Sequence, residues 1–271
     1  MDTTTMVREH YAATNLTGRI MSALAAIAPE DQTLTVAQLA SLDQFHTRGI
    51  LATVELAGAA GIEPSTRVLD LGCGIGGPAR YLAGAFGCRV TGVDLSPGFI
   101  DAAVYLTARC GLTDRVTFLN GDALHLPFGD GAFDTVFLQH VAMNIEGRPA
   151  LYAEVRRILA PGGRFVTYDI VLGDGDVVYP TPWARDASTS FLLSEADTRT
   201  ALEQAGFKAM LWRDDTQTAR DWFKAVVSGP PQSGLSLGIV MGPEFAAATG
   251  NLARNLRENR LGVLSAVLTR A

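Results

Sequence analysis

The stretch Val68-Leu69-Asp70-Leu71-Gly72-Cys73-Gly74-Ile75-Gly76-Gly77 decides the fold. A short apolar run passes directly into a turn rich in glycine, and a helix is expected over residues 76–86. Glycine tolerates positive φ and lets a ligand approach the main chain closely. The spacing Gly72-x-Gly74-x-x-Gly77 also fits the dinucleotide-binding fingerprint. The turn therefore predicts a nucleotide-type ligand but leaves its identity open.

Short β-branched runs alternate with helical stretches on both sides of this turn. Strands are expected at residues 67–70, 89–94, 116–120, 133–138 and 164–170, with further helices at 97–110 and 148–159. This alternation is typical of βαβ units and predicts an α/β fold with a doubly wound parallel sheet. The tail adds helices near 195–205 and 243–260, and strand candidates at 209–214 and 262–269.

Two regions lie outside the alternation. Residues 1–60 show Ala- and Leu-rich helical periodicity around 20–27, 36–42 and 50–60. Residues 173–193 are rich in Gly, Asp and Pro and are too long for an ordinary tight connection, which suggests a functional loop.

Composition narrows the class of protein. The 271 residues, 48% apolar and 18% charged, suit one large domain with a substantial core. The net charge is −6 and no basic stripe occurs, so nucleic acid is not an expected partner. No apolar window is long enough for a membrane span, and residues 1–10 show no signal segment. Three cysteines without CxxC spacing predict reduced thiols in a cytoplasmic protein and no metal site.

Three acidic residues follow successive strands and favour one ligand over another. Asp70 precedes the glycines, where a pyrophosphate would be repelled and a cationic amino acid group would be attracted. Asp94 ends the next strand, where a carboxylate can accept ribose hydroxyls, as it also does in NAD sites. Asp122 is placed to accept the exocyclic amine of adenine. Neither lysine follows a tyrosine by four residues, so one common hydride-transfer pair is missing.

The segment 68–170 resembles the class I S-adenosylmethionine-dependent methyltransferases. The resemblance rests on Asp-x-Gly-x-Gly-x-Gly at 70–76, the acid Asp94, Gly-Asp-Ala at 121–123 and Arg-x-Leu-x-Pro-Gly-Gly at 157–163. It implies a Rossmann-like seven-stranded sheet with an antiparallel last strand, a helical cap over residues 1–60, and a domain over 61–271 with a lid at about 173–193. It implies S-adenosylmethionine as cofactor, held by Asp70, Gly72, Gly74, Asp94, Leu95, Asp122, Ala123 and Gln139.

A narrower resemblance concerns the methyl acceptor. Residues 43–49, 139–145 and 179–184 are similar to bacterial sarcosine/dimethylglycine N-methyltransferases. The resemblance implies a small amine as acceptor. A carbon or oxygen nucleophile on a natural-product intermediate is the main alternative, because this fold hosts many acceptors. A nicotinamide oxidoreductase and a catalytically silent cofactor sensor are the alternatives from other classes.

Acceptor contacts are expected beyond the carboxyl ends of the strands. His140 is a candidate base or acceptor contact, or a histidine that hydrogen-bonds only the cofactor or a helix end. Tyr168 and Trp183 are the other first choices, with Trp183 as a lid aromatic. The wider set of candidates comprises Gln139, Asn144 and Asp169, the aromatic residues Tyr11 and Phe191, His46 at a helix start, and Arg48 or Arg185 for a substrate carboxylate.

Overall fold

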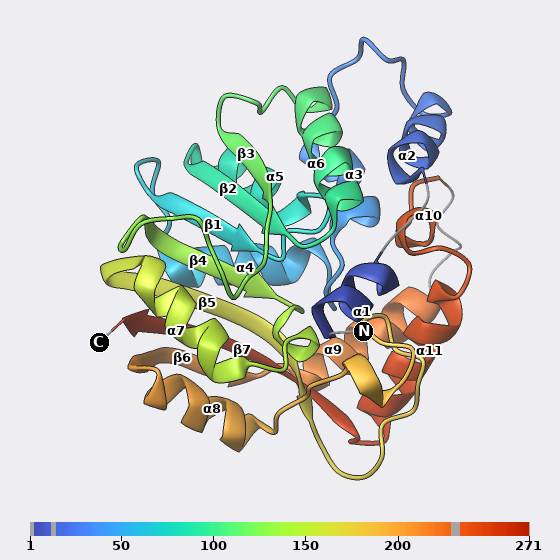
Figure 1. The fold of residues 1–271 in the computed structure, drawn as a ribbon. Coiled ribbons are helices and arrows are strands. Elements are labelled where there is room, and N and C mark those ends of the chain that lie inside the picture. The colour runs from blue at the N-terminus through green and yellow to red at the C-terminus, as the bar shows by residue number, and fades with distance from the viewer. Residues whose placement is uncertain (1–2, 12–14, 229–233, 271) are drawn as a thin grey trace.

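The computed structural model describes residues 3–11, 15–228 and 234–270, and it is built around one seven-stranded sheet (Figure 1). The strand order is β3-β2-β1-β4-β5-β7-β6. The strands are β1 (Arg67–Leu71), β2 (Arg89–Asp94), β3 (Val116–Asn120), β4 (Phe133–Gln139), β5 (Leu159–Leu172), β6 (Phe207–Asp214) and β7 (Leu261–Arg270). The first five are parallel, and β7 runs antiparallel between β5 and β6. The predicted α/β fold with an antiparallel last strand is confirmed.

Helices cover both faces of this sheet. On one face lie α4 (Ile50–Ala60), α5 (Gly77–Phe86), α9 (Thr216–Ser228) and α11 (Phe245–Arg257), whose apolar residues share a core cluster with β1, β2 and β7. On the other face α7 (Arg148–Ile158) and α8 (Glu195–Gln204) pack against β4, β5 and β6. The order of the strands brings the carboxyl ends of β1, β2 and β4 together at one edge, where a ligand is expected.

The N-terminal helices are α1 (Thr3–His10), α2 (Leu16–Ala25) and α3 (Val36–Asp43). With α6 (Pro97–Arg109) and α10 (Leu237–Met241), α2 and α3 form a third apolar cluster beside the sheet (Figure 1). By contrast, α4 packs against β5 and β7. A cap was expected over residues 1–60, but α4, the last helix in this range, belongs to the layer of helices that covers the sheet.

Several element boundaries differ from those expected. Strand β5 begins at Leu159 and continues through Pro161-Gly162-Gly163, which had been expected to precede it. The helices α9 and α10 were not predicted, and they lie in the long segment that separates β6 from β7. No helix within the described ranges combines the length and apolar character needed to cross a bilayer.

Candidate active site

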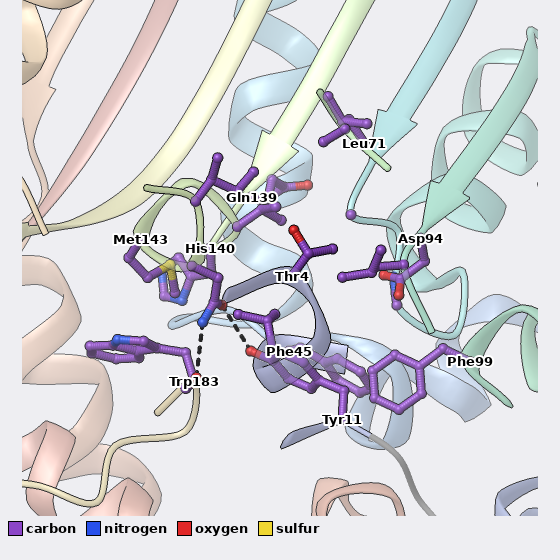
Figure 2. Close-up of a pocket in the computed structure, with 18 of the residues that line it drawn as sticks. Thr4, Tyr11, Phe45, Leu71, Asp94, Phe99, Gln139, His140, Met143 and Trp183 are labelled. Carbon is purple, nitrogen blue, oxygen red and sulfur yellow. Dashed lines mark hydrogen bonds between the residues drawn. The ribbon is translucent and has the colours of Figure 1, made fainter. Parts of the chain in front are cut away.

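A cavity of about 280 Å³ opens at the carboxyl ends of β1, β2 and β4 (Figure 2). Leu71 and Gly72 line it from the first strand and its turn, Asp94 from the second, and Gln139 from the fourth. The cavity lies where a doubly wound sheet places its ligands. Its position agrees with the one expected for the cofactor.

The glycine turn forms one wall of this cavity in a conformation that requires glycine. Gly72 has φ +75°, and a Cβ there would lie 2.2 Å from the Cγ2 of Val141. The backbone N–H of Gly72 donates to the carbonyl of Val93 at 2.7 Å, which fixes the turn against β2. Gly74, with φ +53°, also lines the cavity. The turn therefore places bare main chain against any bound ligand.

Asp94 is the acidic side chain best placed for a ligand. Its Oδ2 accepts the N–H of Gly74 at 2.9 Å and its Oδ1 accepts the N–H of Ser96 at 2.9 Å. Desolvation raises its pKa to about 6, against the pull of these hydrogen bonds. The half-buried carboxylate lines the cavity beside Leu95 and keeps acceptor capacity for hydroxyl donors.

Asp122 and Ala123 line the same cavity after β3. The Oδ1 of Asp122 accepts the N–H of Leu124 at 2.9 Å, so one oxygen belongs to the turn. The other lies 3.5 Å from the Nδ1 of His125. The geometry fits both an adenine contact and a turn-forming acid.

Asp70 does not lie where direct ligand contact was expected. It is buried, is not among the residues lining the cavity, and its Oδ2 has no hydrogen-bond partner among the described residues. Burial, and to a lesser degree the charge of Asp94, raises its pKa to about 7. Its side chain lies behind the glycine turn because the strand directs it towards α5.

Gln139 ends β4, His140 directly follows it, and both residues line the cavity. The amide of Gln139 lies 3.3 Å from the Oγ1 of Thr53 and 3.3 Å from the Nε2 of His46, so it is engaged with the N-terminal segment. His140 has φ +54°, and its backbone N–H donates to the carbonyl of Tyr168 at 2.7 Å. Burial and the neighbouring His46 hold the pKa of His140 well below its usual range.

The prediction that Tyr168 contacts the acceptor is not supported, because its ring is fully buried and does not line the cavity. The ring stacks on His140 with 5.2 Å between centroids. Its hydroxyl lies 2.9 Å from the Oγ1 of Thr47. Tyr168 therefore packs behind His140 and contacts the cavity only through it.

Trp183, Asn144 and Tyr11 line another side of the cavity. In Figure 2, Trp183 and Tyr11 lie on the side away from Leu71. Asn144 accepts the hydroxyl of Tyr11 at 3.1 Å and donates to the carbonyl of Trp183 at 2.9 Å. The indole N–H of Trp183 donates to Ser190 at 2.9 Å. These bonds join the segment after α1, the 3₁₀ turn after β4 and the 173–193 segment around one cavity.

The remaining acceptor candidates lie elsewhere. Arg48 is paired with Glu55 and lies 3.7 Å from Asp215, and Arg185 is exposed beside Glu244. Neither arginine lines the cavity, so the structure does not place either one to meet a substrate carboxylate there. His46 lies in the turn before α4, with its Nε2 2.9 Å from the carbonyl of Gly49. Phe191 and Asp169 are also absent from the lining.

Sequence reasoning missed most of the apolar wall. Phe45 and Phe99 contribute rings from the N-terminal segment and from α6, and Met143 follows β4. The far end is formed by the segment between β6 and β7, through Leu237, Met241, Phe245 and Leu252. The apolar helical periodicity of these residues is the same as that of core residues, so no local signal marked them.

Charge is distributed unevenly around the cavity. Its charged lining residues are the acids Asp94, Asp122 and Glu146. No lysine or arginine of the described ranges lines it. A cationic ligand therefore suits this cavity better than a ligand carrying a phosphate or carboxylate.

A family of methyltransferase domains and several methyltransferases match part of this chain. Residues 69–167 match the methyltransferase domain family. A sterol 24-C-methyltransferase of Gibberella zeae is 37% identical over 119 residues, covering 44% of this chain and 31% of that protein. The chain thus spans about a third of that relative's length.

Two solved structures share the fold over nearly the whole chain. Geranyl diphosphate C-methyltransferase from Streptomyces coelicolor A3(2) is 18% identical with a TM-score of 0.72, covering 100% of this chain and 99% of that one. A putative sarcosine dimethylglycine methyltransferase from Galdieria sulphuraria is 16% identical with a TM-score of 0.65, covering 95% and 99%. Residues 69–167 thus match a methyltransferase domain, and the chain has the fold of these two methyltransferase structures.

Proposed function

We propose that this protein transfers the methyl group of S-adenosylmethionine to a carbon atom of an uncharged, largely apolar small molecule. The observation that carries the proposal is the composition of the cavity. Among its acids, Asp94 ends β2, Asp122 follows β3 and Glu146 precedes α7. The far wall is aromatic and aliphatic, and no cationic side chain of the described residues lines the cavity.

The residues present fit the cofactor. Asp94 would accept the ribose hydroxyls, while Asp122 and Ala123 would meet the adenine. The main chain of Gly72 and Gly74 would approach the amino acid part, with the buried side chain of Asp70 behind the turn. When bound, S-adenosylmethionine supplies a methyl carbon already activated by positive sulfur. The protein has to hold the accepting atom in line with that carbon and keep water out.

The far wall selects the acceptor. A sarcosine or dimethylglycine carboxylate would meet no guanidinium here, since Arg48 and Arg185 are directed elsewhere. A diphosphate would meet the same lack of cations. The sterol relatives are named as methyltransferases that act on carbon, and their acceptor class is uncharged and apolar. We therefore favour carbon methylation over the amine expected from the sequence.

Product formation from a panel of acceptors tests this proposal. The purified chain is incubated with S-adenosylmethionine and with sarcosine, dimethylglycine, geranyl diphosphate, or uncharged terpenoid and phenolic compounds. We expect S-adenosylhomocysteine, with a methylated product by mass spectrometry, only for uncharged acceptors. Methylation of the two amines, with no turnover of uncharged compounds, would contradict the carbon assignment. The Asp94→Ala variant serves as the control for cofactor-independent signal.

A further inference from the structure

Three polar side chains form a continuous hydrogen-bonded chain behind the cavity wall. Thr47 lies in the turn before α4, Tyr168 lies on β5, and His140 directly follows β4. The Thr47 Oγ1 lies 2.9 Å from the Tyr168 hydroxyl and 3.4 Å from the Nε2 of His140. Of the three, only His140 lines the cavity.

The direction of these hydrogen bonds follows from the chemistry of the donors. The Tyr168 hydroxyl is buried, and Thr47 is its hydrogen-bond partner among the described residues. A buried donor needs an acceptor, so the hydroxyl proton of Tyr168 goes to the Oγ1 of Thr47. Thr47, having accepted that proton, directs its own proton to the Nε2 of His140. The Nε2 of His140 is therefore an acceptor.

We propose that these hydrogen bonds hold His140 as the neutral Nδ1–H tautomer. The ring Nδ1–H then serves as a hydrogen-bond donor to an oxygen of the methyl acceptor. The proposal rests on the function proposed above and narrows its acceptor to compounds with a hydroxyl or carbonyl group. A ring that donates at Nδ1 and accepts at Nε2 has no lone pair left for a base. The candidate base of the sequence analysis is thus replaced by a donor.

Three observations support this assignment. The imidazole ring of His140 stacks on Tyr168, and the backbone N–H of His140 donates to the backbone carbonyl of Tyr168. These two contacts fix the ring. Its Nδ1 has no hydrogen-bond partner among the described residues and is not fully buried, and His140 is the member of the chain that lines the cavity. Burial keeps the imidazole neutral at physiological pH, so that it carries one proton.

Nitrogen NMR of the histidine rings tests the tautomer. The chain has four histidines, so a ¹⁵N-histidine sample gives few signals, and the His140→Gln variant identifies those of His140. With S-adenosylhomocysteine bound, we expect a protonated Nδ1 and an unprotonated Nε2 from pH 6 to 8. A protonated Nε2 in the wild-type protein would overturn the proposal. Calorimetric binding of S-adenosylhomocysteine by the same sample tests the proposed function separately.

Substitution of the threonine tests the cause. In Thr47→Val the donor to Nε2 is lost, and we expect the Nε2–H form of His140 to become populated, whereas Thr47→Ser keeps the wild-type tautomer. Thr53→Val is the matched control, because Thr53 contacts His46 and Gln139 but not His140. If folded Thr47→Val kept His140 entirely in the Nδ1–H form, the hydrogen bond from Thr47 would not set the tautomer.

A pair of small probes tests the donor. Cyclohexanone offers a carbonyl oxygen, and methylenecyclohexane replaces that oxygen by carbon in a molecule of nearly the same shape. We expect cyclohexanone to shift the His140 Nδ1–H signal in the S-adenosylhomocysteine complex and methylenecyclohexane to leave it unchanged. Equal shifts from both probes, or none from cyclohexanone at saturation of the cavity, would contradict an oxygen-binding role.

Discussion

The carboxylate of Asp94 at the end of β2 accepts the backbone N–H of Gly74 in the turn after β1, over 2.9 Å. The bond joins the two segments that meet the cofactor in the proposed site. A second bond, from the N–H of Ser96, holds the other oxygen of the same carboxylate. Asp94 thus shapes the turn and also lines the cavity.

Replacing Asp94 by alanine should remove both the ligand contact and this brace. Hydrogen bonds to charged groups are worth about 1.5–3 kcal/mol each, and about 1.4 kcal/mol corresponds to a factor of ten in affinity. We therefore expect Asp94→Ala to weaken S-adenosylhomocysteine binding at least about tenfold in calorimetry. Asp101→Ala, an exposed acid on α6, is the control and should bind as the wild type does. Wild-type affinity in Asp94→Ala would show that the ribose assignment is wrong.

Cofactor affinity should depend on pH through the same residue. Desolvation raises the pKa of Asp94 to about 6 in the free protein, and ribose hydroxyls donate best to the ionised carboxylate. Binding therefore favours loss of the proton. We expect affinity for S-adenosylhomocysteine to be level above about pH 7 and to fall as the pH drops through 6. Calorimetry from pH 5 to 8 measures this, and an affinity that rises at low pH would contradict the assignment.

A buried ion pair joins the N-terminal region to the helix after the glycine turn. Arg80 on α5 donates to Asp43 at the end of α3 over 2.8 Å, and both side chains are fully buried. Removing one partner leaves an uncompensated charge, which costs about 3–5 kcal/mol. We expect Asp43→Ala to lower the free energy of unfolding by about that amount in urea denaturation.

The control for this prediction is the exposed pair of Arg67 and Asp134. Asp134→Ala should cost only about 0–1 kcal/mol, because exposed pairs are screened by water. Equal losses in the two variants would show that burial of the Asp43–Arg80 pair has no special weight.

Trp183 contributes both packing and one wall of the cavity. It is 2% exposed, and its indole N–H is bonded to Ser190. Trp183→Ala should lower the free energy of unfolding by about 3–5 kcal/mol, because a large buried ring is lost. Trp183→Phe should cost much less. Both variants should keep wild-type affinity for S-adenosylhomocysteine by calorimetry, and a loss as large as that of Asp94→Ala would place Trp183 at the cofactor instead of the acceptor.

The part of the cavity proposed for the cofactor could be located from local sequence. Gly72 and Gly74 follow β1 and Asp94 ends β2, two strands whose apolar pattern is clear, and the carboxyl ends of parallel strands meet at one edge. Asp70 precedes the same turn, yet its side chain points away from the cavity. Strand alternation decides this direction, and the glycine motif does not encode it.

The acceptor half could not be predicted in the same way. Phe245 and Leu252 line the cavity from α11, which begins more than 70 residues after the end of β5 in the sequence. Their helical periodicity matches both core and cavity positions. Arg48 was a plausible carboxylate ligand by residue type, but Glu55 and Asp215 already pair with it. Such pairings depend on the folded arrangement of distant segments.

The most direct test of the central claim is a calorimetric titration of the purified chain with S-adenosylhomocysteine and, separately, with NADH. The cavity has an acidic lining, and no lysine or arginine of the described residues lines it to bind a phosphate. Both features favour S-adenosylhomocysteine over NADH. We predict saturable one-to-one binding of S-adenosylhomocysteine that Asp94→Ala weakens, and no heat from NADH. Tight binding of NADH without binding of S-adenosylhomocysteine would contradict a methyltransferase and favour a nicotinamide enzyme.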